Sequence, residues 1–121
     1  MDIHTPLPLL GGLTAGQFMN RHWHKKPLLV RQAIPGFKPP VGRAALFDMA
    51  GRQEVESRLI QHKSGRWLLR HGPLARRSLP SLATREWTVL VQGVDLHDDA
   101  THALMQRFRF VPEARLDDLM I

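Results

Sequence analysis

The strongest constraint on the fold is the stretch from Trp87 to Val94, in which aromatic and β-branched residues predominate and no residue is charged. Such residues are enriched in strands because they pack well on a pleated surface. The absence of charge predicts a strand that is buried on at least one face and central in its sheet. The chain must therefore supply neighbouring strands.

Two neighbouring strands are predicted upstream. Residues 55–62 and 66–71 flank Lys63-Ser64-Gly65, a short glycine-containing turn that suits a β-hairpin. Residues 28–31, an apolar run after Pro27, predict one more short strand.

Three helices are predicted between these strands. The first begins at Thr14, which can form a capping box with Gln17, and Pro27 prevents its continuation. The second covers residues 44–50, before Gly51. The third follows Asp98-Asp99, whose carboxylates suit a helix N-terminus, and extends toward Pro112.

The elements together predict a mixed α/β fold of the α+β type. Residues 1–12, with two prolines and two glycines among leucines, are expected to form an irregular arm, and residues 13–121 one folded domain. No cysteine is present, which excludes a disulfide framework and cysteine-ligated metal. No apolar run is long enough to span a membrane, so we expect a cytoplasmic protein without membrane contact.

The sequence stops on an apolar run, Leu119-Met120-Ile121, without a polar tail. Domain termini are usually exposed and polar, so we expect this run to belong to a helix turn or a strand whose packing partners lie outside the sequence. The domain would then be incomplete. A strand with an unpaired edge predicts self-association.

The charge is lopsided, with 17 Lys and Arg against 11 Asp and Glu, giving a net charge of +6. Cations concentrate between residues 58 and 85, where no acid interrupts them. This basic region predicts contact with RNA or the ribosome through six side chains: Arg58, Lys63, Arg66, Arg70, Arg76 and Arg77. A solvated face that keeps the protein soluble would have the same composition.

Three motifs suggest chemistry, and each has a simpler interpretation. The histidines of His22-Trp23-His24 are two apart on a predicted helix, so they diverge and cannot easily share a metal ion. His97-Asp98-Asp99 contains the His-x-Asp pair of non-haem iron enzymes, but its position favours helix capping. Asp117-Asp118 favours capping or an ion pair over acid-base work. We therefore assign no catalytic, cofactor-binding or metal-binding residue.

Six segments in order resemble one protein family. They are residues 18–30 (with His22-Trp23-His24-Lys25-Lys26-Pro27), 55–59, 67–73, 87–94, 103–109 and 115–121. Together they resemble the opening part of the bacterial cupin-type Jumonji C (JmjC) ribosomal oxygenases, a group that includes the ribosomal protein arginine hydroxylases. Residues 13–121 would then be the N-terminal part of a JmjC domain, truncated at its C-terminal end.

The resemblance implies a double-stranded β-helix dioxygenase that uses Fe(II) and 2-oxoglutarate to hydroxylate an arginine of a ribosomal protein. The helices and strands of this chain would buttress a barrel that is mostly missing. In the family the His-x-Asp and later His iron ligands follow the segment that matches residues 117–121, and this sequence lacks them. We therefore expect the chain alone to bind neither cofactor and to be inactive.

Two alternatives remain open. The chain could be a self-sufficient basic module that binds RNA or a ribosomal protein, with Trp67 or Trp87 stacking on bases, although their strand contexts favour core packing. It could also be a structural subunit whose missing half comes from another polypeptide.

Overall fold

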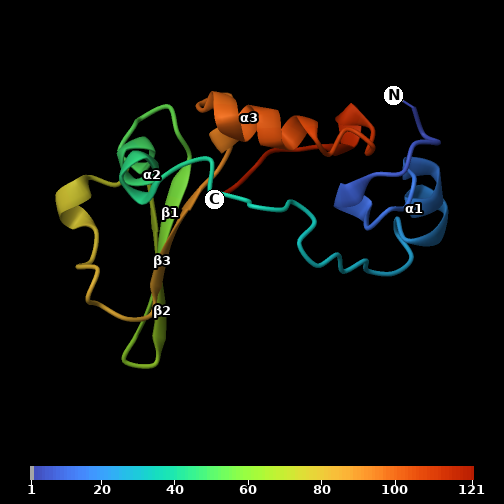
Figure 1. Ribbon diagram of the computed structural model, residues 1–121. Helices are drawn as coiled ribbons and strands as arrows, with labels where there is room; N and C mark the ends of the chain where they lie inside the picture. The colour runs from blue at the N-terminus through green and yellow to red at the C-terminus, as the bar shows by residue number, and fades with distance from the viewer. Residues whose placement is uncertain (1) are drawn as a thin grey trace. The chain divides into compact units, whose positions relative to one another are not determined.

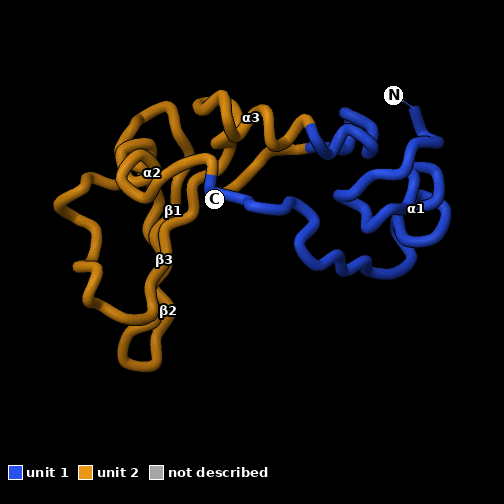
Figure 2. The backbone as a smooth tube through the Cα atoms, viewed as in Figure 1, with its two compact units in different colours: residues 1–39, 107–116 blue, residues 40–106, 117–121 orange. Residues whose placement is uncertain are grey.

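The computed structural model describes residues 2–121, which form two compact units. Unit 1 comprises Met1–Pro39 and Arg107–Leu116, and unit 2 comprises Pro40–Gln106 and Asp117–Ile121 (Figure 2). The chain therefore passes from unit 2 into unit 1 after Gln106 and returns at Asp117.

Unit 1 is organised around α1 (Ala15–Arg21) and two 3-10 turns, η1 (Pro8–Leu10) and η4 (Glu113–Arg115). The predicted capping box is confirmed: the Thr14 hydroxyl accepts from the Gln17 N–H at 3.1 Å, and the Gln17 side chain accepts from the Thr14 N–H at 3.0 Å. The buried core of the unit consists of Leu10, Ala15, Phe110 and Val111. Residues from both ends of the chain thus make one core.

The prediction of a strand at residues 28–31 is wrong. These residues have no strand assignment, and the described backbone offers residues 28–30 no main-chain hydrogen bonds. Leu28 instead packs against the core of unit 1. This packing accounts for Leu28 but not for Leu29, which is 75% exposed. The described residues of unit 1 contain no strand that could pair with the run.

Unit 2 contains a three-stranded antiparallel sheet in the order β2-β1-β3 (Figure 1). Its strands are β1 (Ser57–Lys63), β2 (Arg66–His71) and β3 (Trp87–Val91). The predicted hairpin is confirmed, with Lys63 opposite Arg66 across a two-residue turn. Both turn residues have positive φ, 51° at Ser64 and 72° at Gly65, as the twist of a tight hairpin requires.

The predicted strand at 87–94 is confirmed only in its first part. β3 ends at Val91 because Gly93 turns the chain in the left-handed conformation, with φ of 63°, and η3 (Val94–Leu96) follows. In the described three-stranded sheet β1 lies in the middle, but Val91 of β3 has a backbone partner on each side, Ser57 of β1 and Ile121. β3 is nevertheless buried on one face through Val89 and Val91.

Two helices complete unit 2. α2 (Arg43–Ala50) matches the prediction and contributes Met49 and Ala50 to the core. α3 (Asp99–Gln106) begins where predicted but ends well before Pro112, because the chain leaves unit 2 there. A short 3-10 turn, η2 (Arg76–Ser78), lies in the loop between β2 and β3. The predicted mixed α+β class is confirmed.

The core of unit 2 lies between α2 and one face of the sheet. Its buried members are Met49, Ala50, Val55, Leu59, Leu74, Val89, Val91 and Val94. The strand register places Ile60 and Leu69 opposite each other on the other face of the sheet, where Leu69 is exposed.

The last residues are not unpaired, which corrects the expectation from the sequence. Ile121 exchanges two backbone hydrogen bonds with Val91, at 2.6 and 3.0 Å, and the Val94 N–H donates to the Leu119 carbonyl at 3.0 Å. Ile121 also packs against the core of unit 2. The segment therefore lies along the edge of β3 that β1 leaves free.

Replacement of Gly72 by alanine is predicted to destabilise unit 2. A Cβ at this position would overlap the Ser57 hydroxyl and lie 3.3 Å from the Ser57 Cβ, in a site where Ser57 is buried. Overpacking of this kind costs about 1–3 kcal/mol of unfolding free energy, which urea denaturation would measure.

The matched control is Gly42→Ala, because a Cβ there meets nothing within 4 Å. Ser57→Ala in the Gly72→Ala background should recover part of the loss, since it removes the overlapping hydroxyl. Additive losses in the double variant would contradict this explanation.

Candidate functional site

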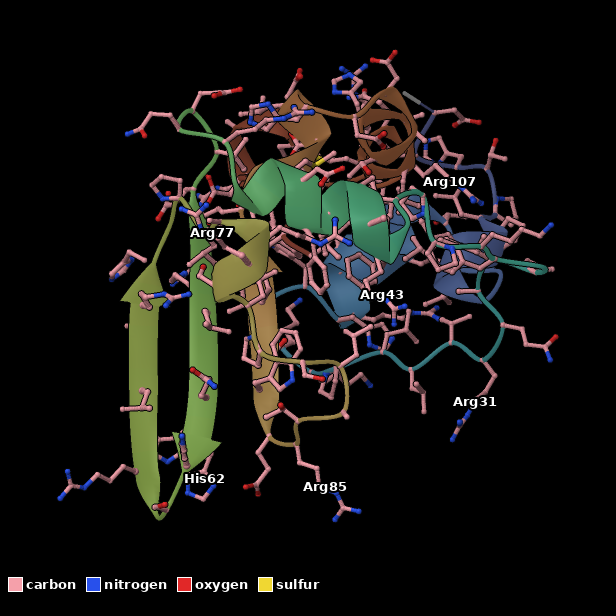
Figure 3. All side chains as sticks on the ribbon, turned by 90° about the vertical axis from the view of Figure 1, so that its left-hand side faces the viewer. Arg31, Arg43, His62, Arg77, Arg85 and Arg107 are labelled. Carbon is pink, nitrogen blue, oxygen red and sulfur yellow. The ribbon has the colours of Figure 1, made fainter. Side chains whose placement is uncertain are left out.

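The six cations predicted to contact RNA all lie in unit 2, but their surroundings differ. Lys63 and Arg66 flank the hairpin turn and are exposed, and Arg77 in η2 is also exposed. Figure 3 shows Arg77 well away from His62, which lies near the turn. The free cations are therefore spread over the unit rather than gathered at one point.

The side chain of Arg58 is engaged within the protein. Its guanidinium donates to the Gln92 side chain at 3.2 Å and lies 3.6 Å from the Met120 sulfur. Its Nε is buried, and the described residues offer it no hydrogen-bond partner. Arg58 thus connects β1 to the residues that follow β3 and to the segment paired with β3.

Arg70 and Arg76 are also engaged within the protein. Arg70 donates to the carbonyl and hydroxyl of Ser78, each at 3.0 Å. Arg76 forms an ion pair with Asp48 at 3.1 Å, and its guanidinium carbon lies 5.3 Å from the centre of the Phe47 ring. These two arginines hold the loop after β2 against β2 and α2.

The basic stretch seen in the sequence is balanced in the fold. Unit 2 contains nine Lys and Arg and nine Asp and Glu, so its net charge is zero. Among the six cations, Arg76 is paired with an acid distant in sequence, Asp48. RNA contact by the six side chains stays a prediction, and Lys63, Arg66 and Arg77 are the three without a described side-chain partner.

The two candidate stacking tryptophans differ. Trp87 is half-buried, as expected for core packing: its indole N–H donates to the Thr84 carbonyl at 3.0 Å, and its ring lies against Phe47. Trp67 is 74% exposed, so core packing is the wrong interpretation there. Its ring lies 4.6 Å from that of His62, centre to centre, on the exposed face of the hairpin.

The structure supports the simpler interpretations of the histidine motifs. His22 stacks on Phe18 and its Nδ1 lies 3.2 Å from the Pro27 carbonyl, whereas His24 is exposed. Within residues 2–121, no three His, Cys, Asp or Glu side chains come close enough to hold a metal ion. The residues present therefore do not fit an iron site, and we assign them no step of an oxygenase reaction.

Asp98 caps α3, as its position predicted. Its carboxylate accepts hydrogen bonds from the Thr101 hydroxyl and the Thr101 N–H, each at 2.7 Å. These two bonds hold the pKa of Asp98 below its ordinary value because they favour the ionised form.

The Asp117-Asp118 pair has a structural role through Asp118. Its carboxylate accepts from the Gly93 N–H at 2.7 Å, while the buried Asp95 accepts from the Leu119 N–H at 2.8 Å. The segment that follows β3 and residues 118–119 thus each supply a carboxylate to the backbone of the other. We call these two bonds the carboxylate clamp.

Comparison with known proteins gives the chain its relatives. No family model matches the sequence. The chain is 39% identical over 104 residues to the ribosomal protein uL16 3-hydroxylase of Escherichia coli K12, an alignment that covers 86% of this chain and 27% of that protein. It is 27% identical over 110 residues to a probable ribosomal oxygenase of Haemophilus influenzae, covering 90% of this chain and 27% of the relative.

The solved structures agree with the sequence comparison. The ribosomal oxygenase YcfD of Escherichia coli superimposes with a TM-score of 0.80 at 38% identity, over 89% of this chain and 29% of YcfD. This chain is homologous to the ribosomal oxygenases. It spans little more than a quarter of their length. A second YcfD structure, in complex with cobalt and 2-oxoglutarate, matches with a TM-score of 0.78 at 37% identity, over 87% of this chain and 28% of YcfD.

Loss of the carboxylate clamp is predicted to destabilise unit 2. Asp118→Ala removes a partly buried acceptor and leaves the Gly93 N–H without its partner, which should cost about 1–3 kcal/mol of unfolding free energy. Asp117→Ala is the control, since Asp117 is exposed and its side chain makes no described hydrogen bond. Equal losses in urea denaturation for the two variants would contradict the clamp.

Capping by Asp98 predicts a pH-dependent effect on stability. Because the folded pKa is lowered, the stabilisation is present above about pH 4, near the unfolded pKa, and is lost as pH falls through the folded pKa. Asp98→Ala should therefore lower the melting temperature at pH 7, and the difference from the parent should shrink in acid. Asp99 takes part in neither bond, so the control variant Asp99→Ala keeps both, and a similar pH-dependent loss for that control would refute the cap.

Proposed function

We propose that this chain is part of a 2-oxoglutarate-dependent ribosomal oxygenase that hydroxylates a ribosomal protein. The observation that carries the proposal is the match to YcfD, which combines 38% identity with a TM-score of 0.80 over 89% of the chain. A relative of the chain is named as a hydroxylase of ribosomal protein uL16, and the relative's structure has been solved with 2-oxoglutarate.

The finer assignments belong to the same proposal. Residues 13–121 would form the N-terminal part of a cupin-type JmjC domain, with Fe(II) as the metal and an arginine side chain as the substrate. Cobalt in the relative's structures supports a divalent first-row metal. No helix in the described part of the chain is long and apolar enough to cross a membrane. The absence of cysteine is consistent with the cytoplasm as the compartment.

The part played by this chain would be structural. Its sheet has one face covered by α2 and another on which Leu69 and Trp67 are exposed, and β3 already pairs with residues 119–121. These features support a buttress for a larger barrel. Self-association through residues 119–121 remains part of the proposal, since Met120 is 48% exposed.

A second candidate is RNA contact by the hairpin. Trp67 is exposed, its ring is tilted against that of His62, and it is close along the chain to Lys63 and Arg66, so the hairpin combines an aromatic ring with cations. Such pairs bind single-stranded nucleic acid by stacking and charge. The zero net charge of unit 2 weighs against a strong interaction.

The purified chain is predicted not to turn over 2-oxoglutarate. With Fe(II), ascorbate and a uL16-derived peptide, succinate measured by NMR should stay at the level of the enzyme-free sample, because the described residues provide no group that could hold the metal. The full-length Escherichia coli relative serves as the active control.

Succinate formation that requires iron and stops with a chelator would contradict the expected inactivity. The oxygenase proposal itself is tested separately, on any longer product of the same gene. A product with a His-x-Asp segment and a later His should hydroxylate the peptide, and its failure to do so would refute the proposed activity.

A further inference from the structure

The net charge of the protein belongs to unit 1. This unit contains eight Lys and Arg and two Asp and Glu, a net charge of +6, which equals that of the whole chain. Its cations are Arg21, Lys25, Lys26, Arg31, Lys38, Arg107, Arg109 and Arg115. Of the two acids, Glu113 is paired with Arg109 at 3.3 Å, and Asp2 accepts hydrogen bonds from His4 and Thr5. Unit 1 therefore presents uncompensated positive charge.

Unit 1 also contains a groove of about 690 Å³ with a mainly apolar lining. Four aromatic residues contribute to the lining: Phe18, Trp23, Phe108 and Phe110. The rings support one another, with Phe18 edge-on to Phe110 at 5.4 Å and Trp23 at 6.4 Å from Phe18, centre to centre. The groove is thus a fixed aromatic surface.

Cations lie at the margin of this groove. Lys26 and His24 contribute to its lining, and the ring of His24 lies 4.8 Å from that of Trp23. Arg31 follows directly on the lining residue Val30, and Figure 3 shows its side chain extending away from the backbone. Neither Lys26 nor Arg31 has an acidic partner among the described residues.

We propose that unit 1 binds single-stranded RNA, with phosphates held by Lys26 and Arg31 and an unstacked base inserted against Trp23. Cations beside an aromatic surface are the two components of single-strand recognition. An acidic peptide matches the charge equally well, but its carboxylates gain nothing from an apolar groove, whereas a base has an apolar face that fits it. This inference does not depend on the oxygenase proposal.

The test is the fluorescence anisotropy of a labelled 12-nucleotide single-stranded RNA titrated with the full chain. Lys26→Gln/Arg31→Gln should weaken binding at least about tenfold at low salt, and should reduce the slope of log K against log salt by about 1.4. The matched control is Arg52→Gln/Arg85→Gln, which removes the same charge from exposed positions of unit 2 and should change affinity less than about twofold. A larger loss in the control would overturn the proposal.

The contribution of the base is tested without altering the protein. An oligomer with the same phosphates but abasic sugars should bind about tenfold more weakly or worse, because stacking is lost. Trp23→Phe, which keeps an aromatic ring, should bind better than Trp23→Ala when circular dichroism shows both to be folded. Equal affinity for the abasic oligomer, equally effective competition by polyglutamate, or no binding at low salt would each overturn the proposal.

Discussion

The carboxylate clamp fixes the point at which the chain returns to unit 2. Between Gln106 and Asp117 the chain supplies Phe110 and Val111 to the core of unit 1, and then Asp118 bonds to the Gly93 backbone while Asp95 bonds to that of Leu119. These short bonds set the register in which Ile121 pairs with Val91. Without these two carboxylate bonds, nothing in the local sequence would direct residues 119–121 to the free edge of β3 or Ile121 to the core of unit 2.

Local signals in the sequence predicted local structure well. The capping box at Thr14, the hairpin around Ser64-Gly65 and the Asp98 cap each depend on residues within a few positions, so their energies are decided by short-range contacts. Two of the failures depended on residues far away in the chain. Residues 28–31 have strand composition but no strand beside them, and α3 stops where the chain changes units.

The charges illustrate the same limit at the candidate site. In sequence, the cations from Arg58 to Arg77 form a stretch without an acid. In the fold, however, Arg76 is paired with Asp48, and Arg58 donates to the Gln92 side chain. The eight cations of unit 1 come from two segments about 70 residues apart in the chain: five lie between residues 21 and 38, a stretch without an acid, and three lie between residues 107 and 115. Composition predicts a basic surface, which stays a prediction, and only the fold separates a balanced unit from an unbalanced one.

The exchange of segments between the units has a consequence for synthesis on the ribosome. The first 39 residues emerge early, yet Leu10 and Ala15 wait for Phe110 and Val111 before their core can close. Unit 2 in turn receives Ile121 last. Domains usually fold as units in the order of their translation. Here both cores are completed by residues 107–121, so the aromatic side chains of the N-terminal segment lack their core partners until those residues have been synthesised.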